Sequence, residues 1–204
     1  MDKELLQKIK GHHGEFLCEA IGSESKEKIV RFKHHIEPPQ SSFSVPNIGG
    51  LREFYDLASS LTLYSCEKDN EAAFYIAKPE QWETLENEFS GWTNMLDEDE
   101  KEAVLPDWYG EHIVIGEIPA SGNYILVITD GFEAGATYEF EHDGFEFIKL
   151  GNSITDFVQK ALDPDEAAFT NMASHMRFID GESDQQWWAR ELRHHHGKVI
   201  TNNV

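Results

Sequence analysis

The sequence predicts an α+β fold in which a largely antiparallel sheet packs against helices. Three observations support this fold class. Short apolar or alternating segments follow one another through turn signals, and Asp143-Gly144 between two such segments is a strong hairpin signal. Apolar residues with helical spacing occur both before and after these segments. The strands are not separated by regularly alternating helices, so a parallel βαβ array is excluded.

The length and composition suit one soluble domain over residues 1–204. Forty per cent of the residues are apolar, which is enough to form a sizeable core. No segment approaches the run of about eighteen apolar residues that a membrane helix needs, and Met1-Asp2-Lys3-Glu4 does not begin a signal peptide. We expect Cys18 and Cys66 to be thiols rather than a disulfide, and therefore a cytoplasmic protein.

The first sixty residues predict two helices separated by a linker. Leu5, Leu6 and Ile9 place a short helix at 2–10. Residues 26–36 fit a helix or a strand, and the alternation does not choose between them. Prolines and serines then mark a linker at about 37–49, and helical spacing follows from Gly50 to Leu61.

The central segments alternate between helical spacing and strand patterns. Asp97 with Glu100 three residues later predicts a capping box for one short helix. In the hairpin, we expect Tyr138 and Phe140 on one face and Glu139 on the other. The predicted elements are a strand at 72–76, helices at 80–90 and 97–105, and strands at 113–118, 124–129, 137–141 and 145–148.

The C-terminal part predicts helices only. Ser153 caps a helix with an apolar face, and Pro164 suits the first position of the next helix. Ser183 with Gln186 begins a last helix at about 184–196, which carries Trp187, Trp188 and Leu192. We expect its apolar side to pack onto the rest of the domain.

The negative charge is concentrated in the middle of the chain. The net charge is −21, and residues 65–146 carry three basic and twenty-one acidic side chains, a net of −18. This segment would repel nucleic acid and anionic membranes. Two interpretations stay open, namely a solubilising surface and a docking face for a basic protein.

The candidate protein-binding residues are acidic side chains and two aromatic residues. Trp108 and Tyr109 follow Pro106-Asp107, so they are either core residues or partly exposed interface anchors. The acidic candidates form two groups, one before and within the short helix and one on the hairpin: Asp97, Glu98, Asp99, Glu100 and Glu102; Glu139, Glu141 and Asp143.

No spacing in the sequence predicts a catalytic, metal or cofactor site. None of the ten histidines forms the i, i+4 pair of a helical zinc site, so we expect surface histidines and no metal, with 194–196 at the negative end of the last helix. Nucleophile-elbow and nucleotide-loop motifs are missing from the sequence. Close carboxylate pairs are expected by chance among thirty-eight acidic residues, so a hydrolase is a minor alternative and we predict no enzyme.

The order of several motifs between about residues 45 and 162 resembles the SUKH superfamily, the Smi/Knr-type group. Ser59 to Leu63 depart from the pattern, since they stand where that family has a glycine-rich turn. The resemblance does not cover 1–44 or 163–204, which we treat as N-terminal and C-terminal helical extensions. The motifs are Leu51-Arg52-Glu53-Phe54-Tyr55, Trp82, Leu105-Pro106-Asp107-Trp108, Ile113 to Glu117, Gly122 to Val127, Tyr138 to Gly144, and Ser153 to Val158.

The resemblance implies a non-enzymatic protein-binding domain. Many bacterial members of that superfamily are immunity proteins that neutralise a protein toxin, a class of partner that includes nucleases. Eukaryotic relatives are adaptors in cell-wall synthesis, so a regulatory adaptor is the alternative. The family shares no catalytic residues, which leaves the acidic segment as the feature that predicts a basic protein partner.

Overall fold

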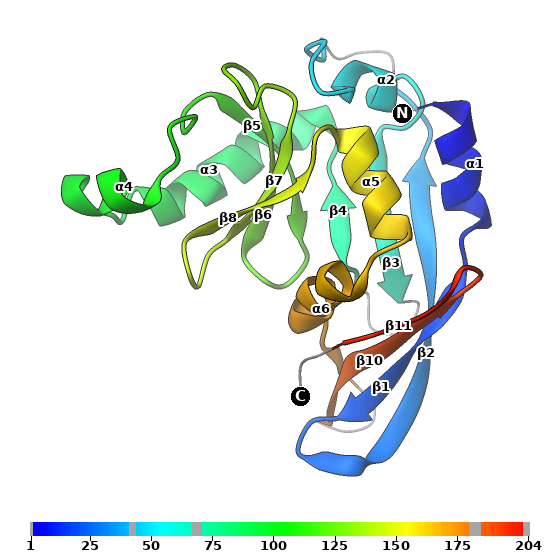
Figure 1. Cartoon of the computed structure of the whole chain (residues 1–204). Helices are drawn as coiled ribbons and strands as arrows, with labels where there is room; N and C mark the ends of the chain where they lie inside the picture. The colour runs from blue at the N-terminus through cyan, green and yellow to red at the C-terminus, as the bar shows by residue number, and fades with distance from the viewer. Residues whose placement is uncertain (1, 41–43, 67–70, 180–184, 202–204) are drawn as a thin grey trace.

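The computed structural model describes residues 2–40, 44–66, 71–179 and 185–201, and it confirms the α+β fold class. One antiparallel sheet of eleven strands runs through the molecule in the order β11-β10-β1-β2-β3-β4-β5-β6-β7-β8, with β9 paired to β10 (Figure 1). Both ends of the chain supply strands to one end of this sheet, so β1 and β2 lie between β10 and β3. The segments outside the resemblance are therefore part of the same sheet.

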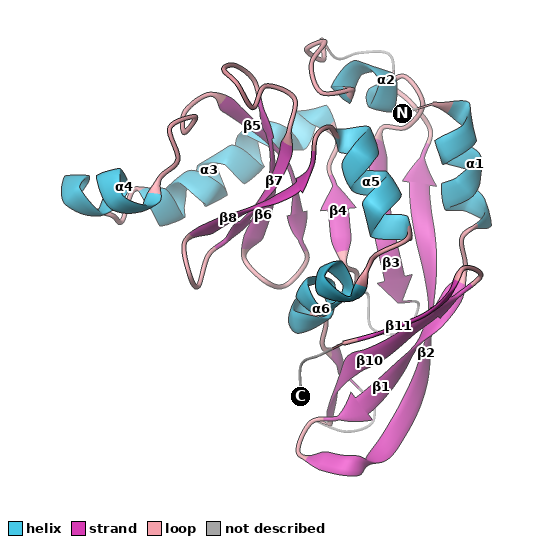
Figure 2. Cartoon of the chain, viewed as in Figure 1, coloured by secondary structure: helices cyan, strands magenta, loops and turns pink. Residues whose placement is uncertain are grey.

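The helices pack around this sheet, as Figure 2 shows. The described helices are α1 (Lys3–Gly11), α2 (Leu51–Tyr55), the 3-10 turn η1 (Pro79–Gln81), α3 (Trp82–Thr93), α4 (Glu98–Val104), α5 (Ile154–Leu162) and α6 (Glu166–His175). The strands are β1 (Gly14–Ala20), β2 (Ser23–Glu37), β3 (Ser60–Cys66), β4 (Phe74–Ile76), β5 (His112–Ile118), β6 (Asn123–Ile128), β7 (Thr137–Glu141), β8 (Glu146–Gly151), β9 (Phe178–Ile179), β10 (Gln186–His194) and β11 (Gly197–Ile200).

Residues 26–36, which the sequence left undecided, belong to the long strand β2. Val30 and Phe32 are buried while Arg31 and Lys33 are exposed, which is the alternation of a strand with one covered face. This strand pairs with β1 on one side and with β3 on the other. The partners on both sides satisfy its backbone groups, which the local sequence alone could not show.

The helix predicted from Gly50 to Leu61 is shorter than expected. It ends at Tyr55, and the chain has entered β3 by Ser60. Leu61 lies between Ile36 of β2 and Ile76 of β4. A strand that is covered on both faces presents an almost continuous apolar run, which helical spacing also fits.

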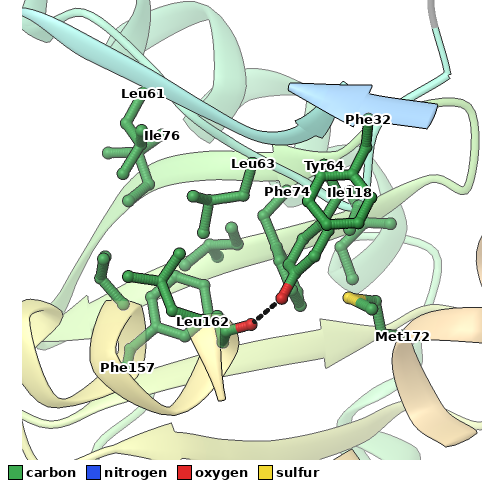
Figure 3. Close-up of a cluster of buried hydrophobic side chains, with 14 of the residues drawn as sticks. Phe32, Leu61, Leu63, Tyr64, Phe74, Ile76, Ile118, Phe157, Leu162 and Met172 are labelled. Carbon is green, nitrogen blue, oxygen red and sulfur yellow. Dashed lines mark hydrogen bonds between the residues drawn. The ribbon is translucent and has the colours of Figure 1, made fainter. Parts of the chain in front are cut away.

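Two hydrophobic clusters cover the two faces of the sheet. The larger one joins α1, α2, α5 and α6 to the sheet, and Figure 3 shows Phe157 and Leu162 of α5 with the strand residues Leu63 and Phe74. Within it the Tyr64 hydroxyl donates to the Ala161 carbonyl at 2.7 Å. The second cluster packs α3 onto the opposite face: Ala77, Leu85, Phe89, Val114, Tyr124, Leu126 and Phe140.

The predicted last helix is wrong, because Gln186–His194 form the strand β10. This strand pairs with β1 and continues through a turn into β11. Trp187 is buried and Trp188 is half-buried, so adjacent tryptophans point to different faces of the sheet. The unpaired edge of β1 supplies backbone partners that helical spacing does not reveal. The predicted cap Ser183 lies outside the described residues.

The remaining C-terminal predictions are largely confirmed. Ser153 caps α5, since its hydroxyl accepts the Asp156 amide at 3.1 Å. The extension is helical at α6, but this helix begins after Pro164 rather than at it. Asp165 is its N-cap and accepts the Ala168 amide at 2.9 Å.

Candidate functional site

The helix α4 presents the first acidic group on the surface, as predicted. The Asp97 carboxylate accepts the Glu100 amide at 2.9 Å, and the Glu100 carboxylate accepts the Asp97 amide at 2.9 Å. This capping box stabilises a helix of seven residues, none of which is buried. Glu98 pairs with Lys101 at 3.0 Å, and Asp99 and Glu102 are exposed. The helix extends away from the sheet in Figure 1.

Apolar side chains accompany the carboxylates of α4. Met95, before the capping box, is 67% exposed, and Val104 in the last turn is 38% exposed. We call residues 95–104 the α4 surface. Its exposed carboxylates and apolar side chains distinguish it from a helix that packs on the core.

Trp108 and Tyr109 are half-buried, which lies between the two predicted interpretations. The Trp108 ring packs on Phe147, with ring centroids 5.2 Å apart, and on Tyr138 at 5.0 Å. The Tyr109 hydroxyl shares a 2.6 Å hydrogen bond with Thr93 Oγ1. Both residues therefore connect the segment after α4 to the sheet and to α3, and each still exposes part of its surface.

Glu139 is not on the surface, and its prediction as a binding residue is wrong. The residue is fully buried, because the face of β7 that carries it is covered by α6 rather than by solvent. Its carboxylate accepts hydrogen bonds from the side-chain amides of Asn123 at 2.8 Å and Asn171 at 3.0 Å. His175 Nε2 lies 3.5 Å from the carboxylate. Burial raises the pKa of this carboxyl, against the opposing effect of its amide donors.

The hairpin tip uses one of the two remaining acidic candidates to hold its turn. The Glu141 carboxylate accepts the backbone amides of Asp143 at 3.1 Å and Gly144 at 2.7 Å. Asp143 is exposed and lies 3.0 Å from His142 Nε2. The His142 ring packs against Trp92 with centroids 4.6 Å apart, which places the tip beside the end of α3. Asp143 is thus the hairpin residue that the structure brings towards the α4 surface.

The expectation of surface histidines is wrong for His12. This residue caps the end of α1 and is only 5% exposed. His12 Nδ1 lies 2.7 Å from His34 Nε2, and His12 Nε2 lies 3.1 Å from His194 Nδ1. Residues from the start, the N-terminal third and the end of the chain therefore meet in one histidine cluster. Sequence spacing gave no signal of it, because the strand register pairs Gly14 with His194.

The structure bears on the membrane prediction, whereas comparison with known proteins identifies no family for this chain. Across the described ranges, no helix has the length and apolar character to span a bilayer. Comparison with known proteins identifies no relative, since no protein-family model, curated protein or solved structure matches the chain.

Proposed function

We propose that this protein is a binding domain for a basic protein, of the toxin-neutralising kind, and that the α4 surface is its docking site. The observation that carries the proposal is a capped helix with three acidic residues in its first turn and no buried residue. A helix that buries nothing contributes little to the core, so its sequence is not explained by packing. The SUKH-like order of motifs is consistent with this function.

The charge distribution supports a basic partner. Residues 65–146, with a net of −18, surround the α4 surface in the sequence, and their carboxylates repel one another at a cost in stability. A cationic protein would relieve this repulsion on binding. Acidic surfaces also steer such partners and raise association rates by roughly 10- to 1,000-fold at low salt. A nuclease toxin, which must present cations to phosphates, has the complementary surface.

Co-expression with the product of the neighbouring gene, scored for rescue of growth, tests the toxin-neutralising function. The docking site is tested with the purified pair by stopped-flow mixing at low and high salt. We expect the variant D99K/E102K to slow association strongly and to weaken its salt dependence, while dissociation changes little. Neither residue takes part in the capping box, so α4 should remain folded.

The matched control is E4K/E166K, which changes the net charge equally on α1 and α6. Association that is slowed to the same extent by both double variants would indicate a general charge effect and not a docking site. An association rate that responds to neither salt nor charge reversal would leave the acidity as a solubility feature. If the protein binds an endogenous regulatory protein and does not neutralise a toxin, the result would favour the adaptor.

A further inference from the structure

The histidine cluster contains the donor set of a metal site. One ligand nitrogen from each of His12, His194 and His195 lies within 4.8 Å of the others. Ligand nitrogens of a tetrahedral zinc ion lie about 3.3 Å apart when each bond is 2.0–2.1 Å. The 3.1 Å between His12 Nε2 and His194 Nδ1 is close to that spacing. We propose that His12, His194 and His195 bind one divalent transition-metal ion of the zinc class.

The cluster is built by the fold and not by one flexible segment. His12 is fixed as the C-cap of α1, where its backbone amide donates to the Lys8 carbonyl at 2.8 Å. His194 is the last residue of β10, and the pairing of Gly14 with His194 holds these two segments together. His195 follows in the turn to β11 and its ring lies 5.2 Å from that of His12. His12 is buried, His194 is half-buried and His195 is exposed, so the ligands reach from the interior to solvent and give a cation an entry path.

The entrance is a groove of about 730 Å³ beside the two C-terminal histidines. Arg31, Lys33 and Arg193 line it together with one carboxylate, Glu15, which lies 4.0 Å from Arg31 and 3.9 Å from Arg193. Arg193 is also paired with Glu191 at 2.6 Å. Three neutral imidazoles suit Zn²⁺, Cu²⁺ or Ni²⁺ and would leave a fourth position for water or an anion.

The hydrogen bonds of the cluster determine which ring nitrogen of each histidine carries the proton before a metal binds. The Tyr64 amide can only donate, so His34 Nδ1 accepts it at 3.1 Å. Neutral His34 then carries its proton on Nε2 and donates to His12 Nδ1, and His12 donates from Nε2 to His194 Nδ1.

Metal binding reverses this chain of hydrogen bonds. A cation at His12 Nε2 requires the proton of that ring on Nδ1, from which it donates to His34 Nε2. His34 must then carry its own proton on Nδ1, and the bond from the Tyr64 amide is lost. No proton leaves the protein in this exchange. The resonance of the Tyr64 amide therefore reports a metal bound at His12. A metal held by surface histidines alone would leave that resonance unchanged.

The experiment is calorimetric titration of the full, tag-free chain with Zn²⁺, together with absorption spectra of the Co²⁺ form. We expect one ion per chain with a micromolar or lower dissociation constant, the intense Co²⁺ bands of tetrahedral coordination, and a shift of the Tyr64 amide resonance on adding Zn²⁺. H12Q and H194Q should each weaken binding at least roughly tenfold, because loss of an outer-shell partner alone has an effect of that size. The matched control is H35Q, since His35 is exposed and is not one of the proposed ligands.

Absence of stoichiometric binding would overturn the proposal. Unchanged affinity in H12Q would also overturn it, because the ion would then be held by the adjacent surface histidines His194 to His196 alone. If the buried substitution H12Q prevents folding, then H194Q and the Tyr64 resonance decide. An unchanged affinity in H194Q, or a Tyr64 amide that Zn²⁺ does not move, contradicts the site.

Discussion

The two ends of the sheet differ in how they use charge. The end built from β1, β2 and β9–β11 comes from residues 1–40 and 176–204, in which eleven basic and eleven acidic side chains balance. Several of its ion pairs cross between strands, as in Arg190 with Glu19 at 3.1 Å. The other end contains β4–β8, α3 and α4 and carries the net of −18 over residues 65–146. Its pair of Glu98 with Lys101 lies within one exposed helix.

This difference shows that the net charge of −21 describes neither end of the molecule. Where charges balance, cross-strand pairs can support the register, and the rings of His12, His34 and His194 lie together. Where carboxylates dominate, like charges must stay solvated, which keeps the α4 surface exposed. The balanced end therefore joins both ends of the chain in one part of the sheet, and the acidic end carries the surface that we propose as the docking site.

The largest effect should come from the balanced end, at Trp187. This residue is 7% exposed and lies on β10 opposite Ala20, with Lys28 over its ring at 5.7 Å. Trp187→Ala should lower the free energy of unfolding by about 3–5 kcal/mol, as for other buried tryptophans. Trp188→Ala, at the half-buried neighbour, should cost less. Equal denaturation midpoints for Trp187→Ala and the wild type in urea would show that β10 does not stabilise the sheet.

A pH-dependent effect should come from the border between the acidic surface and the core, at Glu139. A carboxyl whose pKa is raised on folding binds its proton more tightly in the folded protein. Its contribution to stability is therefore greatest at and below the unfolded pKa and is lost as the pH rises through the folded pKa. Glu139→Gln mimics the protonated carboxyl, so we expect the stability of this variant to fall less between pH 5 and 8.

The groups that face Glu139 are Asn123, Asn171 and His175. The charge of Glu141 also raises the pKa of Glu139, so the matched control is Glu146→Gln, at an exposed residue of β8. Urea unfolding at several pH values measures both variants. Parallel pH profiles for wild type and Glu139→Gln would contradict the raised pKa.

The smallest effect on global stability should come from the acidic end, at Asp97. Loss of this N-cap costs the helix about 1 kcal/mol, but α4 has no buried residue, so the loss should remain local. For Asp97→Ala we expect faster amide hydrogen exchange at Glu100 and Lys101 with an unchanged unfolding midpoint. Asp165→Ala is the control, because its helix α6 buries Phe169 and Met172 and the midpoint should fall. A fall in the midpoint for Asp97→Ala would mean that α4 is part of the core.

Local patterns were sufficient wherever an element is defined by its own side chains. The capping box of Asp97 and Glu100, the cap at Ser153 and the hairpin around Asp143-Gly144 all formed as predicted, since their hydrogen bonds join residues within a few positions. The α+β class followed from the same local signals. The surface position of the acidic residues of α4 and of Asp143 also followed from the sequence, because charged side chains are rarely buried.

Tertiary structure decided every feature that depends on pairing between distant segments. Gln186–His194 is a strand because β1 offers it an edge, and Glu139 is buried because α6 covers its face of β7. The meeting of His12 with His194 likewise follows from strand register alone. Sequence by itself determined the composition of each segment and its local hydrogen bonds. The fold decided which segments share a face, because backbone pairing and burial join residues that no local spacing relates.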